Sequence, residues 1–393
     1  MNNKDTSLRL TILLGVLTAL PALGTDLYLP ALPEIAQSLA VPVSAAQFTL
    51  TTYFIGLAAG QFLWGPLSDR FGRKPVLLAG LAMVLVSSVV GAFVESIGAL
   101  SAVRLAQGLA MASGSLIGRA IVRDLHAHEQ AARLLARMAI VFSIVPIAAP
   151  LAGALLTTAG GWPMVFAGMA AVAAVLLVAL TRLSETAPAE RRSIHPGAIT
   201  RTFGALLVDR RFLAPFSLIL CAQVGILAWV SNSSFTLVRG LGVSVTAFSL
   251  MFALVMLGQI CGAWASSRLV IRLGIRRLLS IGSTVMFAAG AAGALLAWSG
   301  VGHWLAVVLP FMLFLFGTAM LMPNAIAAAL TPFPQSAGSA TSLIGAIGFG
   351  SGALISTALG LLFDGTARPM ATTAGLAGVG ALVAHRLLHH GKA

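Results

Sequence analysis

The sequence predicts an all-α membrane protein with twelve transmembrane helices in two pseudo-symmetric six-helix bundles. Of the 393 residues, 58% are hydrophobic and only 9% are charged. The mean hydropathy is +0.97, which is too high for a soluble domain of this size. Apolar runs of about 20 residues, long enough to cross the hydrocarbon of a bilayer, recur along the chain. A long polar segment separates six of these runs from six more.

Each apolar run predicts one transmembrane helix. The runs start near Leu8, Ala46, Val76, Ile97, Leu134 and Met164 in the first half, and near Phe212, Thr246, Leu278, Leu305, Ala340 and Met370 in the second. We therefore expect an N-terminal bundle at residues 1–182, a cytoplasmic linker at 183–211 and a C-terminal bundle at 212–393. Prolines within the first, fifth and tenth runs predict bends in those helices.

The formal net charge of +13 follows from membrane orientation rather than from binding to nucleic acid. All but three of the 24 Lys and Arg residues fall in segments on one side of the predicted membrane. The exceptions are Arg239 and Arg368 on the other side and Arg104 within a span. Basic residues accumulate in cytoplasmic segments, so we expect both termini in the cytoplasm, lipid as the surroundings and no nucleic acid partner.

The chain offers no pattern typical of catalysis or metal binding. Cys221 and Cys261 lie in apolar spans, and the histidines of the loop and tail segments have no supporting acids or thiols. A G-x-x-x-x-G-K-[ST] phosphate loop is absent from the sequence. We therefore expect no metal, no cofactor, no enzyme activity and no transport driven by ATP.

A basic segment of eleven residues, Gly65-Pro-Leu-Ser-Asp-Arg-Phe-Gly-Arg-Lys-Pro75, joins the second and third spans. Gly72 suits a tight reversal, and the bases at Arg70, Arg73 and Lys74 suit a cytoplasmic loop. Because an acid contributes little to topology, Asp69 indicates a specific partner, such as the N-terminus of a neighbouring helix. The alternative is an ordinary cytoplasmic loop.

The second half carries a trace of the same segment, Arg272-Leu-Gly-Ile-Arg-Arg277, in which Gly274 corresponds to Gly72. Ile271 stands where the first copy has Asp69. The pattern favours two diverged copies of one six-span unit.

Two charged residues lie within predicted spans, where such groups are costly and indicate function by default. Asp26 in the first span is a candidate for loading and releasing a proton, although it could also cap a helix end at the outer surface. Arg104 in the fourth span could pair with Asp26 in one conformation and release it in another. The alternative for Arg104 is a permanent structural ion pair.

Polar, aromatic and flexible residues within the spans are candidates for a substrate cavity. They are Tyr28, Tyr53, Gln107, Met111, Phe142, Gln223, Trp229, Asn232 and Asn324. Each of them could equally pack against a neighbouring helix or face lipid. Since the second-half spans carry no charge, we expect neutral or mildly amphipathic cargo.

Four motifs resemble the major facilitator superfamily of transporters. The segment G-x-L-x-D-R-x-G-R-K from Gly65 to Lys74 resembles the signature between its second and third helices. Leu100, Arg104, Gln107 and Gly108 match its fourth-helix motif. Pro146, Ala149, Pro150 and Gly153 resemble the fifth-helix motif of drug/proton antiporters, although that motif usually has Gly-Pro followed by paired glycines. Asp26-Leu-Tyr-Leu-Pro-Ala-Leu-Pro33 is similar to the first-helix segment of the bicyclomycin and chloramphenicol resistance (Bcr/CflA) subfamily.

The resemblance implies a monomeric, proton-coupled drug/proton antiporter in a bacterial inner membrane, which exports small organic compounds by alternating access. It implies proton coupling at Asp26 and Arg104, and a bend and packing seam between the halves at Pro146, Pro150 and Gly153. It also implies a cytoplasmic gate at Gly65, Asp69, Arg70, Gly72, Arg73 and Lys74. The alternative within this fold is an exporter or proton symporter of an amino acid, sugar or nucleobase. A membrane enzyme or a channel should show clustered catalytic residues or a repeated filter loop, which this sequence lacks.

Overall fold

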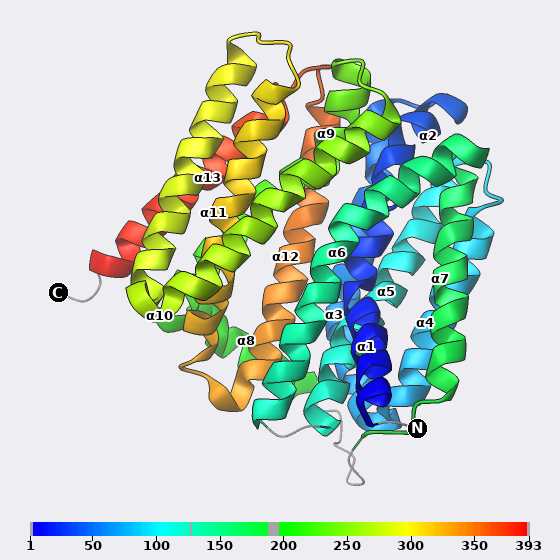
Figure 1. Ribbon diagram of the computed structural model, residues 1–393, viewed down its shortest axis with the longest axis vertical. Helices are drawn as coiled ribbons and strands as arrows, with labels where there is room; N and C mark the ends of the chain where they lie inside the picture. The colour runs from blue at the N-terminus through cyan, green and yellow to red at the C-terminus, as the bar shows by residue number, and fades with distance from the viewer. Residues whose placement is uncertain (1–2, 126–127, 188–195, 391–393) are drawn as a thin grey trace. The chain divides into compact units, whose positions relative to one another are not determined.

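Helices form all the regular structure in residues 3–125, 128–187 and 196–390, the part of the chain that the computed structural model describes (Figure 1). The chain divides into two compact units, Met1–His195 and Pro196–Ala393. The domain borders expected after residues 182 and 211 remain a prediction. A helix, α8 (Pro196–Val208), lies within the segment that we predicted as a linker.

The described part of the first unit contains six long helices. They are α1 (Asn3–Asp26), α3 (Val43–Phe71), α4 (Arg73–Gly91), α5 (Ile97–Leu125), α6 (His128–Gly160) and α7 (Pro163–Thr181). After α1 the chain turns through the short 3-10 helix η1 (Leu29–Ala31) into α2 (Leu32–Ser38), since Pro30 and Pro33 favour the first turn of a new helix. Helix α5 packs against α1, α3 and α4 and so forms much of the core of this unit.

The second unit is built around α9 (Arg210–Ser234), which packs against three other helices. These are α11 (Leu305–Leu330), α12 (Ala337–Leu361) and α13 (Arg368–His390). Helix α9 continues as a π-helix, η2 (Phe235–Gly240), and a 3-10 turn, η3 (Pro334–Ser336), precedes α12. Helix α10 (Val245–Trp298) packs against α11 and α13.

Helix α10 consists of two helices that meet at Gly274, where the backbone has φ 74° and ψ 162°. Figure 1 shows its two arms meeting at a bend. The two spans predicted to start near Thr246 and Leu278 correspond to these arms. Prolines lie inside α1, α6 and α11, as the sequence predicted, but each of these helices continues through them.

Length and apolarity qualify nine helical segments of the described chain as membrane spans, with α10 counted once and α1 joined to α2. Helices α3 and α13 fall outside this set, but their 29 and 23 residues are long enough to cross a bilayer at 1.5 Å per residue. With α10 counted as two, the described helices comprise the twelve predicted spans, six in each unit. The protein is thus an all-α, multi-pass membrane protein.

Candidate functional site

The turn between α3 and α4 is made by Gly72, which has φ 104° and ψ 157°. This region of backbone space is accessible almost only to glycine. Phe71 ends one helix and Arg73 begins the next, so the reversal takes a single residue. The predicted tight turn therefore lies at Gly72.

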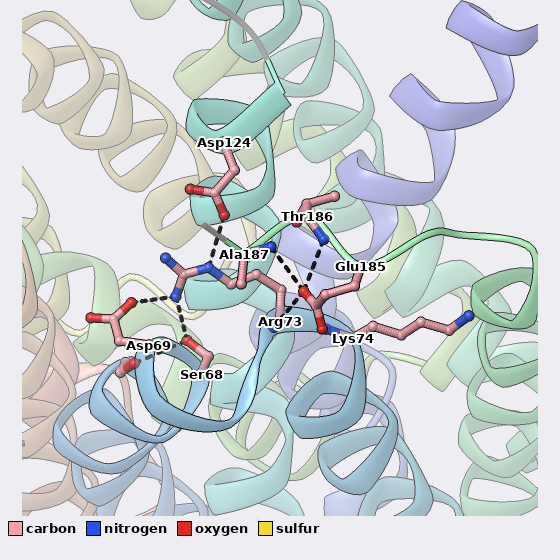
Figure 2. Close-up of polar contacts among 9 residues, drawn as sticks. Ser68, Asp69, Arg73, Lys74, Asp124, Glu185, Thr186 and Ala187 are labelled. Atoms are coloured by element: carbon pink, nitrogen blue, oxygen red, sulfur yellow. Dashed lines mark hydrogen bonds and ion pairs between the residues drawn. The ribbon is translucent and has the colours of Figure 1, made fainter. Parts of the chain in front are cut away.

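Arg73 is the centre of a cluster of polar side chains at this turn (Figure 2). Its Nε donates to Asp124 Oδ2 at 2.9 Å, and its Nη1 donates to Ser68 Oγ at 2.7 Å and also to Asp69 Oδ1. Its side chain is only 11% exposed. Two carboxylates from α3 and α5 therefore hold the first residue of α4, and the three helix ends are joined through one guanidinium group.

Glu185, which follows α7, binds the N-terminus of α4 (Figure 2). Its carboxylate accepts from the backbone N–H groups of Arg73 at 2.9 Å and Lys74 at 3.3 Å, and from those of Thr186 and Ala187. Because the first N–H groups of a helix have no partner within it, a carboxylate at this place is a helix cap. Partial burial of the carboxyl raises the pKa of Glu185, but the four N–H donors lower it by more, so it lies below its ordinary value.

Sequence reasoning predicted the turn but missed two of its three acids. The Asp69 carboxylate contacts the Arg73 side chain, whereas the carboxylate bound at a helix N-terminus belongs to Glu185. Asp124 and Glu185 were detectable by the argument applied to Asp69, because each is an acid in a basic cytoplasmic segment.

Arg70 stacks on Phe71, with its guanidinium carbon 5.3 Å from the ring centroid. Gly65, the remaining residue of the motif, lies in α3, and a Cβ there would meet nothing within 4 Å.

Arg104 on α5 is fully buried and lies between two tyrosine rings. Its guanidinium carbon is 4.2 Å from the ring centroid of Tyr28 and 4.0 Å from that of Tyr53. Its Nη2 donates to the backbone oxygen of Gly24 at 3.0 Å and its Nη1 to Gln107 Oε1 at 2.8 Å. Gly24 lies in the last turn of α1, where carbonyl groups form the negative end of the helix dipole. The charge is therefore stabilised by π faces and by carbonyl oxygens.

Further hydrogen bonds fix the groups that surround Arg104. Gln107 Nε2 donates to Ser88 Oγ at 2.9 Å, and the Tyr53 hydroxyl donates to the backbone oxygen of Pro21 at 2.8 Å. The hydroxyls of Tyr28 and Thr49 are 2.7 Å apart. This cluster therefore connects α1, α3, α4 and α5 around one buried cation.

Glycine at position 108 allows Tyr53 to reach Arg104. A Cβ on Gly108 would overlap the backbone oxygen of Tyr53 and come within 3.1 Å of the backbone nitrogen of Leu57. Only glycine permits α3 and α5 to approach this closely. The fourth-helix motif therefore supplies both the cation and the space for its aromatic neighbour.

Asp26 is the last residue of α1 and is 5% exposed. We predicted it well within a span; it is followed by the turn into α2, and the apolar segment Leu8–Ser38 continues on both sides of it. No ion pair joins Asp26 to Arg104 in the described chain, although Arg104 contacts the backbone of Gly24 two residues away. The predicted pairing is therefore absent from this structure.

Glu34 is a second acid of the first span that sequence reasoning passed over. It lies in α2, and its Oε1 accepts from the backbone N–H of Trp162 at 3.2 Å, at the start of α7. Its position eight residues after Asp26, within the same apolar segment, was the available signal. Glu34 thus links α2 to α7.

The four residues of the predicted antiporter motif lie in α6 at Pro146, Ala149, Pro150 and Gly153. A Cβ on Gly153 would overlap the backbone oxygen of Leu27 and come within 3.3 Å of its Cα. This contact lies within the first unit, directly after Asp26. The motif therefore packs α6 against the turn that ends α1, and its predicted place in a seam between the halves remains a prediction.

The candidate cavity residues fall into two groups. Tyr28, Tyr53, Gln107 and Met111 gather around Arg104, where the Tyr53 hydroxyl lies 3.2 Å from Met111 Sδ.

The others are spread over separate environments. Phe142 is exposed on α6, and Gln223 on α9 is half-buried. Trp229 packs between Phe252 and Phe311, and Asn324 donates to Ser266 Oγ at 2.9 Å. Asn232 is buried in α9. A shared substrate cavity remains a prediction.

The described residues contain no group of three or more His, Cys, Asp or Glu that could hold a metal ion.

The sequence profile of the Major Facilitator Superfamily matches residues 14–385. The chain belongs to this superfamily. It is therefore a membrane transporter of the major facilitator fold and not an enzyme.

Alignments with individual relatives cover most of this chain. The bicyclomycin resistance protein homolog of Haemophilus influenzae is 31% identical, over 99% of this chain and 98% of its own length. The chloramphenicol resistance protein of Pseudomonas aeruginosa is 30% identical, over 88% of this chain and 84% of its own length. The crystal structure of a D-xylose-proton symporter matches with a TM-score of 0.75 at 16% identity, over 98% of this chain and 97% of its own, which supports the fold alone.

Proposed function

We propose that this transporter exports small organic drugs in exchange for protons, by alternating access across a bacterial inner membrane. Two relatives that cover most of the chain are named for resistance to bicyclomycin and to chloramphenicol, which supports drugs as the cargo. The distribution of Lys and Arg supports cytoplasmic termini. The protein acts as a monomer, with each chain supplying one transport path.

The observation that carries the proton coupling is a buried carboxyl group in the same helical turn as a backbone carbonyl that binds a buried cation. Asp26 is 5% exposed and bears no ion pair, while Arg104 is bonded to the carbonyl of Gly24 in the same helical turn. Intramembrane acids of this kind mark proton pathways in transporters. Asp26 takes up a proton in one conformation and releases it in another as the end of α1 moves relative to Arg104.

The cluster at Arg73 acts as the cytoplasmic gate of this cycle. Bonds to Asp69, Asp124 and Glu185 hold the ends of α3, α5 and α7 to the start of α4. Such a bonded arrangement on the cytoplasmic side stabilises the outward-facing conformation relative to the inward-facing one. The prolines of α6 supply the bend that this change requires.

Proton coupling is tested in liposomes that hold a trapped pH-sensitive dye. With a proton gradient imposed, chloramphenicol should trigger proton movement in the wild-type protein and none in Asp26→Asn. Glu95→Gln, which alters an exposed loop acid, should behave as wild type. A response of Asp26→Asn equal to wild type would remove Asp26 from the pathway. A response only to amino acids, sugars or nucleobases would replace drug export by metabolite transport.

The gate is tested by cysteine-accessibility labelling from both membrane faces. Asp69→Asn should shift the labelling pattern toward the inward-open state, since Arg73 loses one of its carboxylates. Asp364→Asn, in an exposed loop, is the control. Identical patterns in Asp69→Asn and wild type would contradict the gate.

A further inference from the structure

The second unit contains a turn with the same backbone as the turn at Gly72. Gly274 has φ 74° and ψ 162°, against φ 104° and ψ 157° at Gly72. Both conformations belong to the region that glycine alone adopts freely. The weak sequence repeat around Gly274 is therefore a structural repeat.

In the first unit this turn binds anionic groups. The carboxylates of Asp69 and Asp124 bind the Arg73 guanidinium, and the carboxylate of Glu185 binds the N–H groups that begin α4. A helix N-terminus flanked by basic side chains is a general anion site. Three carboxylates thus neutralise the first turn.

The second turn has the bases without the acids. Ile271 stands at the position of Asp69, and Ile275 at that of Arg73. Four exposed arginines surround the turn: Arg268, Arg272, Arg276 and Arg277. None of the four forms an ion pair with a described residue, and no described side chain caps the helix that starts after Gly274.

The second turn is also open and partly apolar. A Cβ on Gly274 would meet nothing within 4 Å. Trp264 is 63% exposed and Ile271 is 90% exposed, and the guanidinium carbon of Arg268 lies 5.5 Å from the centroid of the Trp264 ring. Tryptophan and arginine with these exposures are typical of the boundary between hydrocarbon and headgroups.

We propose that the turn around Gly274 binds the phosphate of an anionic phospholipid. The phosphate takes the place of the missing carboxylates, bound by the arginines and by the N–H groups of the uncapped helix start. Trp264 and Ile271 contact the glycerol and acyl chains. These apolar contacts favour lipid over free phosphate. Six crossings separate the two turns, so both lie on one side, the cytoplasmic side in the orientation given under the proposed function, on which this inference rests.

The test measures lipid binding to the purified protein in nanodiscs and by native mass spectrometry. The triple variant Arg268→Gln/Arg272→Gln/Arg276→Gln should bind phosphatidylglycerol about a hundredfold more weakly, given about a fivefold effect for each basic residue near a membrane surface. Arg133→Gln/Arg137→Gln/Arg386→Gln, which removes three exposed arginines elsewhere, should weaken binding much less, because these residues do not surround Gly274. Arg272→Gln alone should show about a fivefold loss if the triple variant does not purify as a single species.

Three results would overturn the proposal. They are equal binding of phosphatidylglycerol by the triple variant and wild type, equal binding of phosphatidylglycerol and phosphatidylcholine by wild type, and displacement of the lipid by millimolar inorganic phosphate. In a nanodisc, lipids reach both faces of the protein whatever its orientation. The experiment measures lipid binding and not transport. The outcome therefore does not depend on proton coupling or drug export, and their failure would be seen separately in the liposome assay.

Discussion

Tyr53 stabilises Arg104 through two parts of its side chain that substitution can separate. The ring centroid lies 4.0 Å from the guanidinium carbon, and the hydroxyl donates to the backbone oxygen of Pro21. Tyr53→Phe removes only the hydroxyl, whereas Tyr53→Leu also removes the aromatic ring. We expect the second change to cost far more, because the described chain offers Arg104 no carboxylate in place of the ring.

The magnitudes follow from the contacts. Loss of the hydroxyl should cost about 1 kcal/mol, since the Pro21 oxygen keeps the hydroxyl of Thr25 as a second donor at 2.8 Å. A desolvated cation–π contact contributes about 2 kcal/mol, and the smaller leucine leaves space that adds about 1 kcal/mol. The free energy of unfolding should therefore fall by about 1 kcal/mol in Tyr53→Phe and about 4 kcal/mol in Tyr53→Leu.

The assay is a double-mutant cycle measured by equilibrium unfolding in mixed detergent micelles. Combining Tyr53→Leu with Arg104→Met should reveal a coupling energy of about 2 kcal/mol, since the cation–π contact is lost only once. Combining Tyr53→Leu with Arg386→Met, at an exposed site in the second unit, should be additive. Equal losses in the phenylalanine and leucine variants, or a coupling energy below about 0.5 kcal/mol, would refute the role of the ring.

Two further predictions concern the turn at Gly72 and the packing of α6. Gly72→Ala should lower stability by about 1–3 kcal/mol, measured by thermal unfolding; an unchanged midpoint would contradict the glycine-only backbone. Gly153→Ala should cost about 1–3 kcal/mol and slow transport, because its Cβ would meet the rigid backbone of Leu27; Gly98→Ala, where a Cβ has open space, is the control.

Glu185→Gln should destabilise the protein at pH 7. Because the folded-state pKa of Glu185 is lowered, its contribution is present above about pH 4.3, the ordinary value for Glu, and is lost as pH falls through the folded-state pKa. The stability difference from wild type should therefore shrink below pH 4, and a constant difference would contradict this assignment.

The fold was predictable from the sequence because the bilayer imposes a length on every span. Hydropathy located the helices to within a few residues, and Gly72 and Gly274 marked the reversals within long helical segments. The break after Asp26 was harder to predict, since the apolar run continues through Pro30 and Pro33 and hydropathy does not register a short turn.

The candidate site was predictable in its residue types but not in its pairings. Asp69 and Arg73 were found together because they are neighbours in one turn of chain. Asp124 and Glu185 are 51 and 112 residues from Arg73, and only tertiary packing brings them close. Tyr28 and Tyr53 were assigned to a cavity, since sequence alone gives no sign that their rings would cover Arg104.

Glu185 also extends the first unit beyond the end of α7. Its carboxylate ties the chain after α7 to the first N–H groups of α4, so residues up to Ala187 belong mechanically to the first unit. An event that detaches Glu185 would release both the first turn of α4 and the chain that follows α7, so one carboxylate couples two segments that lie 112 residues apart in the sequence.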